Sequence, residues 1–376
     1  MMERIFSPAS DEGPARRVAA IAARLEHLGA GYDAEPMFPS ESMQELASAG
    51  LHQDFAPQAS GGMIFASEEE RHREMFDVLR AVGRADLSVG RLYEGHVNAM
   101  ALFDWYGTAG QHSWLCQELR TGAFYGVWAT EPLPGVHLNC DGEGRLCLEG
   151  SKTFASGAGG LAHCVITVQG HESERRMVVV RANEAARADL SQWRVRGMRA
   201  SVSGCYDVTG LEPDPAALLG GPGDYDRDPR FTTGAWRFTA VQLGGIEALL
   251  TETRTAMSQT AREDPLQRAK FAHSVAATRT AYLWVRECAL RAARNDPDGP
   301  AFARMTRGIV ERAALDVMEL AARIVGTRSA MDGQRIDKII RDLSLYLRQA
   351  GPDYARDQAA IAWLERDAWG DGDGLW

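Results

Sequence analysis

The chain has 376 residues, of which 45% are hydrophobic and 24% are charged, as is typical of folded globular proteins. Its formal net charge of −10 argues against broad nucleic-acid binding, because proteins of that kind present a basic face. No apolar run approaches the ~20 residues that a membrane helix needs, and residues 1–17 lack the apolar core of a secretory signal. The length exceeds that of one ordinary compact core, so we expect two or three.

Six cysteines are spread along the chain without a CxxC pair or a metal-like cluster. They are Cys116, Cys140, Cys147, Cys164, Cys205 and Cys288. In a chain of this size they are expected to be buried thiols in a reducing environment, which predicts a cytoplasmic protein without a bound metal.

The first third of the chain shows helical periodicity. Val18, Ile21 and Leu25 fall at helical spacing, and Gly29 and Gly31 are expected to end that helix. A Ser-x-x-Glu sequence at residues 67–70 resembles a capping box that opens a second helix. Two more helix-like stretches, residues 87–107 and 111–122, each end in glycine.

The periodicity changes in the middle of the chain, where short segments rich in β-branched residues are punctuated by Gly, Asn and Asp. These segments predict strands of a compact sheet domain, at residues 145–157, 163–170, 175–182 and 205–213. The Gly-, Pro- and Asp-rich stretch at residues 220–231 is expected to be a linker.

Helical periodicity then returns in four long segments with short joins, which predicts an antiparallel bundle. The segments are residues 236–262, 266–295, 301–324 and 334–348. The predicted fold class is therefore α+β, with an N-terminal helical domain (1–122), a middle β-barrel domain (123–227), a C-terminal four-helix bundle (228–365) and a flexible tail (366–376).

Two segments of the middle domain resemble flavin-binding motifs of the acyl-CoA dehydrogenase superfamily. The sequence GVWATEP at residues 126–132 is similar to the family's x-x-T-E-P signature, and the resemblance places Trp128, Ala129 and Thr130 at the edge of the flavin ring. The sequence LEGSKTFASGAG at residues 148–159 is similar to N-G-x-K-x-W-I-T-N-G. It places Phe154 at the aromatic position beside the flavin and Ser156 at the hydroxyl that bonds the ring.

Three further segments follow in family order. Residues 197–213 resemble a G-x-R-x-S segment followed by a closing strand, and residues 339–349 resemble a final core helix that begins with M-R-D. Residues 261–271 stand where the family has R-x-x-F-G, which implies that Arg262 reaches the FAD pyrophosphate of a neighbouring subunit. The resemblance thus implies the family fold, FAD as cofactor, and self-association as a homodimer or homotetramer.

The sequence departs from the family at the catalytic base. An acyl-CoA dehydrogenase needs a carboxylate beside the flavin to remove an α-proton, and most members carry it in a Y-E-G-T sequence. Here residues 349–352 align with that sequence, and Ala350 replaces the glutamate. Some members carry the base early in the first bundle helix, but the corresponding residues 231–241 contain no acid. Asp353, three residues beyond Ala350, is one candidate base.

A polar cluster at residues 91–99 offers a second set of catalytic candidates. Arg91, Glu94 and Asn98 share one helix face, and this helix resembles the one that lines the family's acyl pocket. His96 matches the use of histidine near the flavin in monooxygenases of this fold. The alternatives are a packing ion pair between Arg91 and Glu94, and a core histidine. His137 borders the pocket entrance or is a surface loop residue.

Three functions follow from these observations. The first is an FAD-dependent oxidoreductase of acyl-CoA dehydrogenase type, which removes hydride from a small organic or acyl thioester substrate such as a CoA thioester. The second is a flavin-dependent monooxygenase of the same fold that uses reduced flavin and O2, which the missing glutamate and His96 favour. The third is a catalytically silent flavin- or ligand-binding scaffold. The first is preferred by a small margin, with no nucleic-acid or membrane partner.

Overall fold

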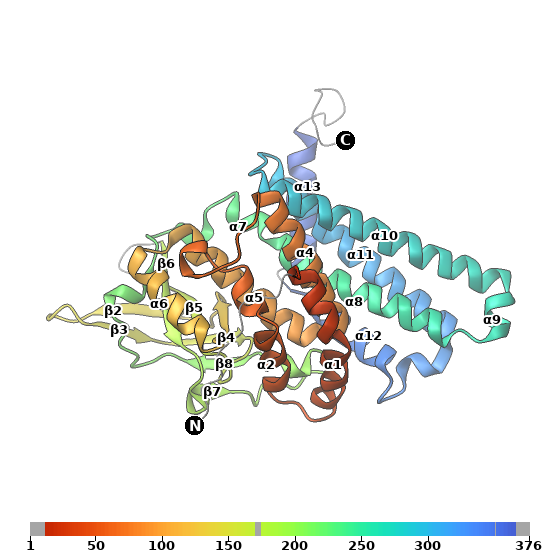
Figure 1. Ribbon diagram of the computed structural model, residues 1–376, viewed down its shortest axis with the longest axis horizontal. Coiled ribbons are helices and arrows are strands. Elements are labelled where there is room, and N and C mark those ends of the chain that lie inside the picture. Colours follow the sequence, from red (N-terminus) through yellow and green to blue (C-terminus); the bar gives the residue numbers. More distant parts are fainter. Residues whose placement is uncertain (1–11, 170–173, 350, 366–376) are drawn as a thin grey trace.

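The computed structural model describes residues 12–169, 174–349 and 351–365, so the predicted tail and Ala350 lie outside the described residues. In Figure 1 a β domain lies on one side, a long helical bundle on the other, and the N-terminal helices between them. The helices before the first strand are α1 (Pro14–Ala34), α2 (Ser40–Ser48), α3 (Leu51–Asp54), α4 (Glu68–Ala85), α5 (Leu87–Tyr106) and α6 (Ala109–Arg120).

Helix α1 runs past the two glycines that were expected to end it. It continues through Gly29 and Gly31 to Ala34. The reason is packing, because a Cβ on Gly29 would lie 2.2 Å from an Oδ atom of Asp86. Gly29 therefore permits the close approach of α1 to the start of α5 and does not act as a helix terminator.

Helix α4 begins where the capping box was predicted. The Ser67 hydroxyl accepts a hydrogen bond from the Glu70 N–H at 3.1 Å, as expected for an N-cap residue. The Glu70 carboxylate reaches one residue further back than in a standard box, to the N–H of Ala66 at 2.6 Å. The first turn of α4 is therefore closed from both sides.

Helix α5 is the central element of the molecule, in contact with β1 and with the bundle helix α8. Most of its residues are buried. Its sequence therefore shows no separate polar face, unlike that of a helix on the surface. Glycines bring the neighbouring helices close together, because a Cβ on Gly83 of α4 would lie 2.3 Å from the Val241 carbonyl oxygen of α8. Polar groups on α5 are thus held in a rigid interior.

The β domain consists of two hydrogen-bonded sheets. The strands are β1 (Tyr125–Trp128), β2 (His137–Cys140), β3 (Leu146–Glu149), β4 (Ser151–Ala155), β5 (His163–Gln169), β6 (Arg175–Arg181), β7 (Ala188–Asp189), β8 (Gly204–Asp207) and β9 (Leu218–Leu219). The larger sheet has the order β3-β2-β5-β6-β9, with β1 parallel to β5, and the smaller has the order β4-β8-β7. The sheets pack through Trp128 of β1 and Tyr206 of β8, whose ring centroids are 5.0 Å apart.

The C-terminal part is helical, as predicted, but its helices divide differently. They are α7 (Arg230–Thr233), α8 (Ala235–Ala256), α9 (Gln259–Glu263), α10 (Pro265–Ala293), α11 (Gly299–Val325), α12 (Arg335–Tyr346) and α13 (Pro352–Leu364). The expected first helix, residues 236–262, breaks after Ala256 because Ser258 caps a separate α9 through the Ala261 N–H. In Figure 1, α8, α10 and α11 extend together away from the β domain.

Residues 220–231 join β9 to the C-terminal helices, as expected of a linker, and they also pack on the β domain and α5. Asp226 pairs with Arg175 of β6, and the Tyr106 hydroxyl donates to the Asp224 carbonyl at 3.0 Å. The expectation for the cysteines needs correction. The cysteines are free, but of the six only Cys164 and Cys288 are fully buried, and Cys140 is exposed. Within the described ranges no helix is long and apolar enough to cross a membrane.

Candidate functional site

The two predicted flavin-binding segments lie side by side, tied together by three contacts. The Trp128 indole N–H donates to the Ser156 carbonyl at 3.0 Å, and the Thr153 N–H donates to the Thr130 carbonyl at 3.0 Å. Lys152 of β4 forms an ion pair with Glu131. The structure therefore brings the end of β1 and the end of β4 together, as the resemblance implied.

Phe154 stands out at this junction because of its backbone and its exposure. Its φ of 51° lies in the left-handed region, which bulky residues rarely adopt, and the β4–β8 register shifts between Lys152 and Ala155. Its side chain is 63% exposed. A strained backbone that presents an aromatic ring to the surface is typical of a ligand site, because burial of the ring would otherwise be favourable.

Ser156 is nearly buried and begins a chain of hydroxyl groups. Its Oγ lies 2.9 Å from the Ser203 Oγ, which in turn lies 2.9 Å from the Ser201 Oγ. The Ser201 hydroxyl donates to the Met198 carbonyl at 2.8 Å, and the Met198 N–H donates to the Asp342 carboxylate. Three serine hydroxyls and the backbone of Met198 thus link Ser156 to helix α12.

Asp342 belongs to a buried ionic triad that anchors this series. Lys338 of α12 donates to Asp342 at 2.7 Å and to Asp86 at 2.8 Å. Burial opposes the Lys338 charge, but the two carboxylates outweigh it and raise the pKa of Lys338, while burial raises the pKa of Asp342. Gly197 lets the loop approach α12, because a Cβ there would lie 2.0 Å from the Arg341 carbonyl oxygen. Arg341 and Asp342, the R-D of the segment at residues 339–349, therefore anchor this loop.

A second polar network lies between α5 and α8. Glu94 is 1% exposed, pairs with Arg91 one turn earlier, and accepts a hydrogen bond from the Asn98 amide. The Asn98 carbonyl accepts from the Arg237 guanidinium of α8. Burial lowers the pKa of Arg237 to about 10, so this side chain is still a cation at neutral pH. Arg237 stands in the stretch of the first bundle helix where some members of the family carry their acid.

Tyr346, at the end of α12, faces this network without a hydrogen bond of its own. Its hydroxyl is buried and has no partner among the described residues. Burial, followed by the negative charge of Glu94, raises the pKa of Tyr346, so the phenol remains protonated. A buried donor without a partner is costly, which suggests that a ligand atom completes its hydrogen bond.

A narrow cavity of about 10 Å³, room for about one water molecule, lies between the two halves of the site. It is lined by Arg91, Leu92, Gly95, Gly126, Val127, Trp128, Ser156 and Leu161. Arg91 of the α5 network and the two motif residues Trp128 and Ser156 therefore line the same cavity. The described lining contains no carboxylate.

His96 does not face this cavity. Its Nε2 lies 2.6 Å from the His52 carbonyl oxygen, and its Nδ1 accepts the Tyr125 N–H at 3.1 Å. Burial lowers the pKa of His96 to about 3, which keeps the ring neutral. Both nitrogens are used by the backbone, so we assign His96 to packing, the alternative that its sequence context had left open.

Three other candidates lie apart from the network. Asp353 is almost fully exposed at the start of α13, where it pairs with Arg356. Arg262 binds the carbonyl groups that end α8, among them that of Met257 at 3.1 Å. His137 begins β2 and is half-buried. None of the three takes part in the contacts described above, and the approach of Arg262 to a neighbouring subunit stays a prediction.

Sequence reasoning missed Arg237, Tyr346 and Ser203. Arg237 and Tyr346 lie on bundle helices, far along the chain from α5, and their role depends on how those helices pack. Ser203 gave a weak signal, because a Ser-x-Ser sequence within the G-x-R-x-S segment offered two hydroxyls beside the closing strand. Only the fold shows that these side chains meet Glu94 and Ser156.

Comparison with known proteins agrees with this architecture. Residues 229–355 match the family model for the acyl-CoA dehydrogenase C-terminal domain. No curated protein sequence matches the chain. At the identities given below, the likeness to solved structures establishes the fold.

Three solved structures illustrate the range of similar proteins. FMN-bound TdsC from Paenibacillus sp. A11-2, a dibenzothiophene monooxygenase, is 18% identical, with a TM-score of 0.84 over 94% of this chain and 97% of its own. Methanesulfinate monooxygenase MsuC from Pseudomonas fluorescens is 20% identical, with a TM-score of 0.82 over 95% and 98%. Butyryl-CoA dehydrogenase from Megasphaera elsdenii is 16% identical, with a TM-score of 0.81 over 97% and 100%.

Proposed function

Because the chain has the acyl-CoA dehydrogenase fold and carries that family's C-terminal domain at residues 229–355, we propose that it is a flavin-dependent oxidoreductase. The residues at the ends of β1 and β4 fit a flavin ring. Thr130 is exposed and offers a hydroxyl, Ser156 offers a second one beside the cavity, and Phe154 presents an exposed ring under backbone strain. FAD and FMN both carry this ring, and when bound it supplies the redox chemistry.

We favour an oxygenase that uses reduced flavin and O2 over a thioester dehydrogenase. The observation that carries this choice is the state of Glu94, whose carboxylate is held by both Arg91 and Asn98. A carboxylate in such a network is a poor base for an α-proton. Arg237 stands on α8 where some dehydrogenases carry their acid, and Asp353 lies at the surface. Among the described residues, neither place therefore supplies a free carboxylate to act as base.

The same network suits a reaction in which negative charge develops on oxygen. The Arg91 guanidinium borders the cavity and can stabilise such charge, as fixed cations do in a water-excluded site. The Tyr346 phenol keeps its proton and can donate a hydrogen bond. Glu94 then serves to hold Arg91 in place.

A dehydrogenase remains the second candidate because Glu94 lies so close to the cavity. If a substrate drew Arg91 away, the carboxylate would be left buried without its main partner and could accept a proton. The structural likeness to butyryl-CoA dehydrogenase gives this alternative a precedent in fold alone.

Self-association as a homodimer or homotetramer forms part of the proposal. Large apolar side chains are exposed on two bundle helices: Leu266, Val275 and Leu283 on α10, and Tyr354, Ile361 and Leu364 on α13. On α13 the spacings of seven and three place Tyr354, Ile361 and Leu364 on one helix face, and a contiguous exposed apolar face is suited to an interface. Light scattering on the purified chain measures the assembly directly, and a monomer at micromolar concentration would contradict this part.

Two mixing experiments on the flavin-saturated protein test the proposed reaction. For an oxygenase, the chemically reduced protein mixed with O2 should show a third absorbing species before the oxidised spectrum returns. For a dehydrogenase, a panel of acyl-CoA thioesters should instead bleach the oxidised flavin without oxygen. Bleaching by a thioester would overturn our choice, and failure to bind either FAD or FMN would leave the silent scaffold.

A further inference from the structure

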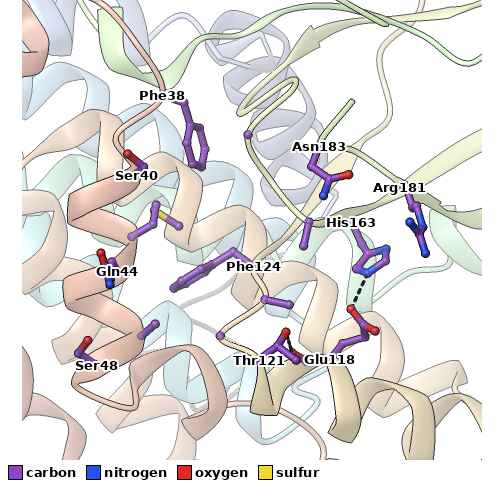
Figure 2. A pocket seen from close by; sticks show the side chains of 16 residues that line it. Phe38, Ser40, Gln44, Ser48, Glu118, Thr121, Phe124, His163, Arg181 and Asn183 are labelled. Atoms are coloured by element: carbon purple, nitrogen blue, oxygen red, sulfur yellow. Dashed lines mark hydrogen bonds and ion pairs between the residues drawn. The ribbon is translucent and has the colours of Figure 1, made fainter. Parts of the chain in front are cut away.

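A large cavity among the described residues lies outside the candidate flavin site. Its volume is about 810 Å³, within the range of small-molecule sites. It is bounded by α2, the end of α6, the start of β5 and the end of β6 (Figure 2). In Figure 2 the side chains of α2 stand on one side, His163, Arg181 and Asn183 stand on the other, and Phe124 lies between them.

This cavity and the narrow flavin-side cavity lie back to back. Gly160 and Ala162 line the large one, whereas Leu161 between them lines the narrow one. Strand β1 divides in the same way, because Phe124 just before it faces the large cavity and Trp128 at its end faces the narrow one. The large cavity is therefore a separate space behind the turn that closes the flavin site.

One end of the large cavity holds an oriented imidazole. The Nε2 of His163 lies 2.9 Å from a carboxylate oxygen of Glu118, and the ring stacks on Tyr125 with centroids 5.1 Å apart. Burial lowers the pKa of His163, so the ring is neutral near pH 7. With its proton on Nε2 toward Glu118, the ring leaves Nδ1 as an acceptor for a hydroxyl or N–H group.

The same end carries a cation and an amide. Arg181 ends β6, is exposed, and has no side-chain partner among the described residues. Its charge acts on His163, which places the two groups near each other. Asn183 lines the cavity two residues later. A guanidinium beside an amide is suited to a carboxylate, which accepts two parallel hydrogen bonds from arginine.

The opposite side offers Phe38 and an apolar strip of α2, beside the polar Ser40, Gln44 and Ser48 of the same helix. Phe38 packs on the Cα of Gly160, where a Cβ would lie 2.3 Å from the ring, and Met43 and Ala47 of α2 continue this wall toward Phe124. A flat ring fits between two aromatic side chains, because offset and edge-to-face contacts add to the burial of its area.

We propose that this cavity is a second small-molecule site, which binds an aromatic carboxylate bearing a hydroxyl group. The ring lies against Phe38 and Phe124, the carboxylate is held by Arg181, and the hydroxyl donates to the Nδ1 of His163. The site does not depend on the flavin, so the proposal stands apart from the proposed reaction.

The test uses calorimetric titration of the full chain with three matched probes. They are 2-hydroxyphenylacetate, which carries its hydroxyl and carboxylate on one side of the ring, its uncharged amide, and acetate, which lacks the ring. We expect saturable 1:1 binding of the first probe and at least tenfold weaker binding of the other two. Arg181→Gln should lower the affinity for the first probe about tenfold, which is the effect of losing one charged hydrogen bond. Arg120→Gln, at an exposed arginine outside the cavity, should leave it unchanged.

A second variant and the flavin spectrum locate the site. Ser48→Trp places a large side chain on the exposed, cavity-facing side of α2 and should abolish binding without disturbing the core. The probe should not displace bound flavin. Millimolar probe without detectable binding, equal affinity in Arg181→Gln, unchanged binding in Ser48→Trp, or release of flavin on titration would each overturn the proposal.

Discussion

Lys152 and Glu131 form a buried ion pair that joins the two flavin-motif segments. The Lys152 side chain is 0% exposed, and its ammonium group also donates to the Thr167 hydroxyl at 3.2 Å. Burial lowers the pKa of Lys152, and the Glu131 carboxylate opposes that shift. The glutamate of the T-E-P sequence thus keeps a buried lysine charged, while the backbone beside it positions Thr130.

Replacement of Glu131 by glutamine should destabilise the protein and weaken flavin binding. It leaves an uncompensated charge in the interior, and breaking such pairs costs about 3–5 kcal/mol, of which we expect about 2–4 because Glu131 is partly exposed. The junction of β1 and β4 should loosen at the same time. Urea unfolding and flavin titration measure the two effects.

The double variant Glu131→Gln with Lys152→Met provides the control. It removes both charges, so most of the lost stability should return. A buried apolar side chain costs less free energy at this site than a buried ammonium group without a partner. A double variant as unstable as Glu131→Gln alone would show that the pair does not act through its charges.

Removal of the Ser203 hydroxyl should alter the flavin rather than the fold. Ser203→Ala breaks the series of hydrogen bonds behind Ser156 and should cost only about 1 kcal/mol in unfolding free energy. The Ser156 hydroxyl would then be free to turn, and the reduction potential of bound flavin should shift. Ser113→Ala, at an exposed serine of α6, is the matched control. An unchanged potential in Ser203→Ala would remove the serine series from the flavin site.

The sequence predicted those parts of the molecule that depend on local pattern. Helix periodicity located the bundle, and Ser67 was recognised as a cap because its hydrogen bond spans three residues. Trp128 and Ser156 were placed together by resemblance, and the structure joins them through one hydrogen bond. In each case the contact is encoded within a short segment or a known motif.

Residues whose role depends on distant packing were not predictable in the same way. Gly29 looked like a helix terminator until Asp86, far along the chain, was placed against it. His96 was a catalytic candidate because the sequence near it does not show the partners of its ring. These partners are backbone groups of α3 and β1, which lie far from His96 in the sequence. Arg237 was passed over because the search there was for an acid, yet the guanidinium completes the network of Glu94.

His96 should make the protein less stable in acid. Its folded pKa of about 3 lies below the ordinary 6.5, so between these values the unfolded chain binds a proton that the folded chain does not. The contribution is complete above pH 6.5 and is lost as pH falls, by about 1.4 kcal/mol per pH unit, or about 2 kcal/mol at pH 5. His96→Gln should reduce the difference in unfolding free energy between pH 8 and pH 5 by that amount.

Flavin binding serves as the second readout for His96. Because both ring nitrogens bind backbone groups, His96→Gln should retain flavin and turnover at pH 8 once its stability is taken into account. The exposed His27→Gln variant should change neither property. A folded, flavin-bound His96→Gln protein without activity would return this histidine to the mechanism.

Arg262 should distinguish FAD from FMN as the bound cofactor. Its Nε and one terminal nitrogen bind carbonyl groups at the end of α8, which fixes the side chain and leaves the other terminal nitrogen available for a phosphate. If the resemblance holds, that nitrogen reaches the pyrophosphate of FAD in a neighbouring subunit, a group that FMN lacks. Arg262→Gln should then lower the affinity for FAD about tenfold, the effect of one charged hydrogen bond, and leave the affinity for FMN unchanged.

Loss of the α8 contacts alone should cost about 0.5–1 kcal/mol of unfolding free energy and affect the binding of both flavins equally. Equal affinities before and after the substitution would therefore confine the role of Arg262 to the end of α8.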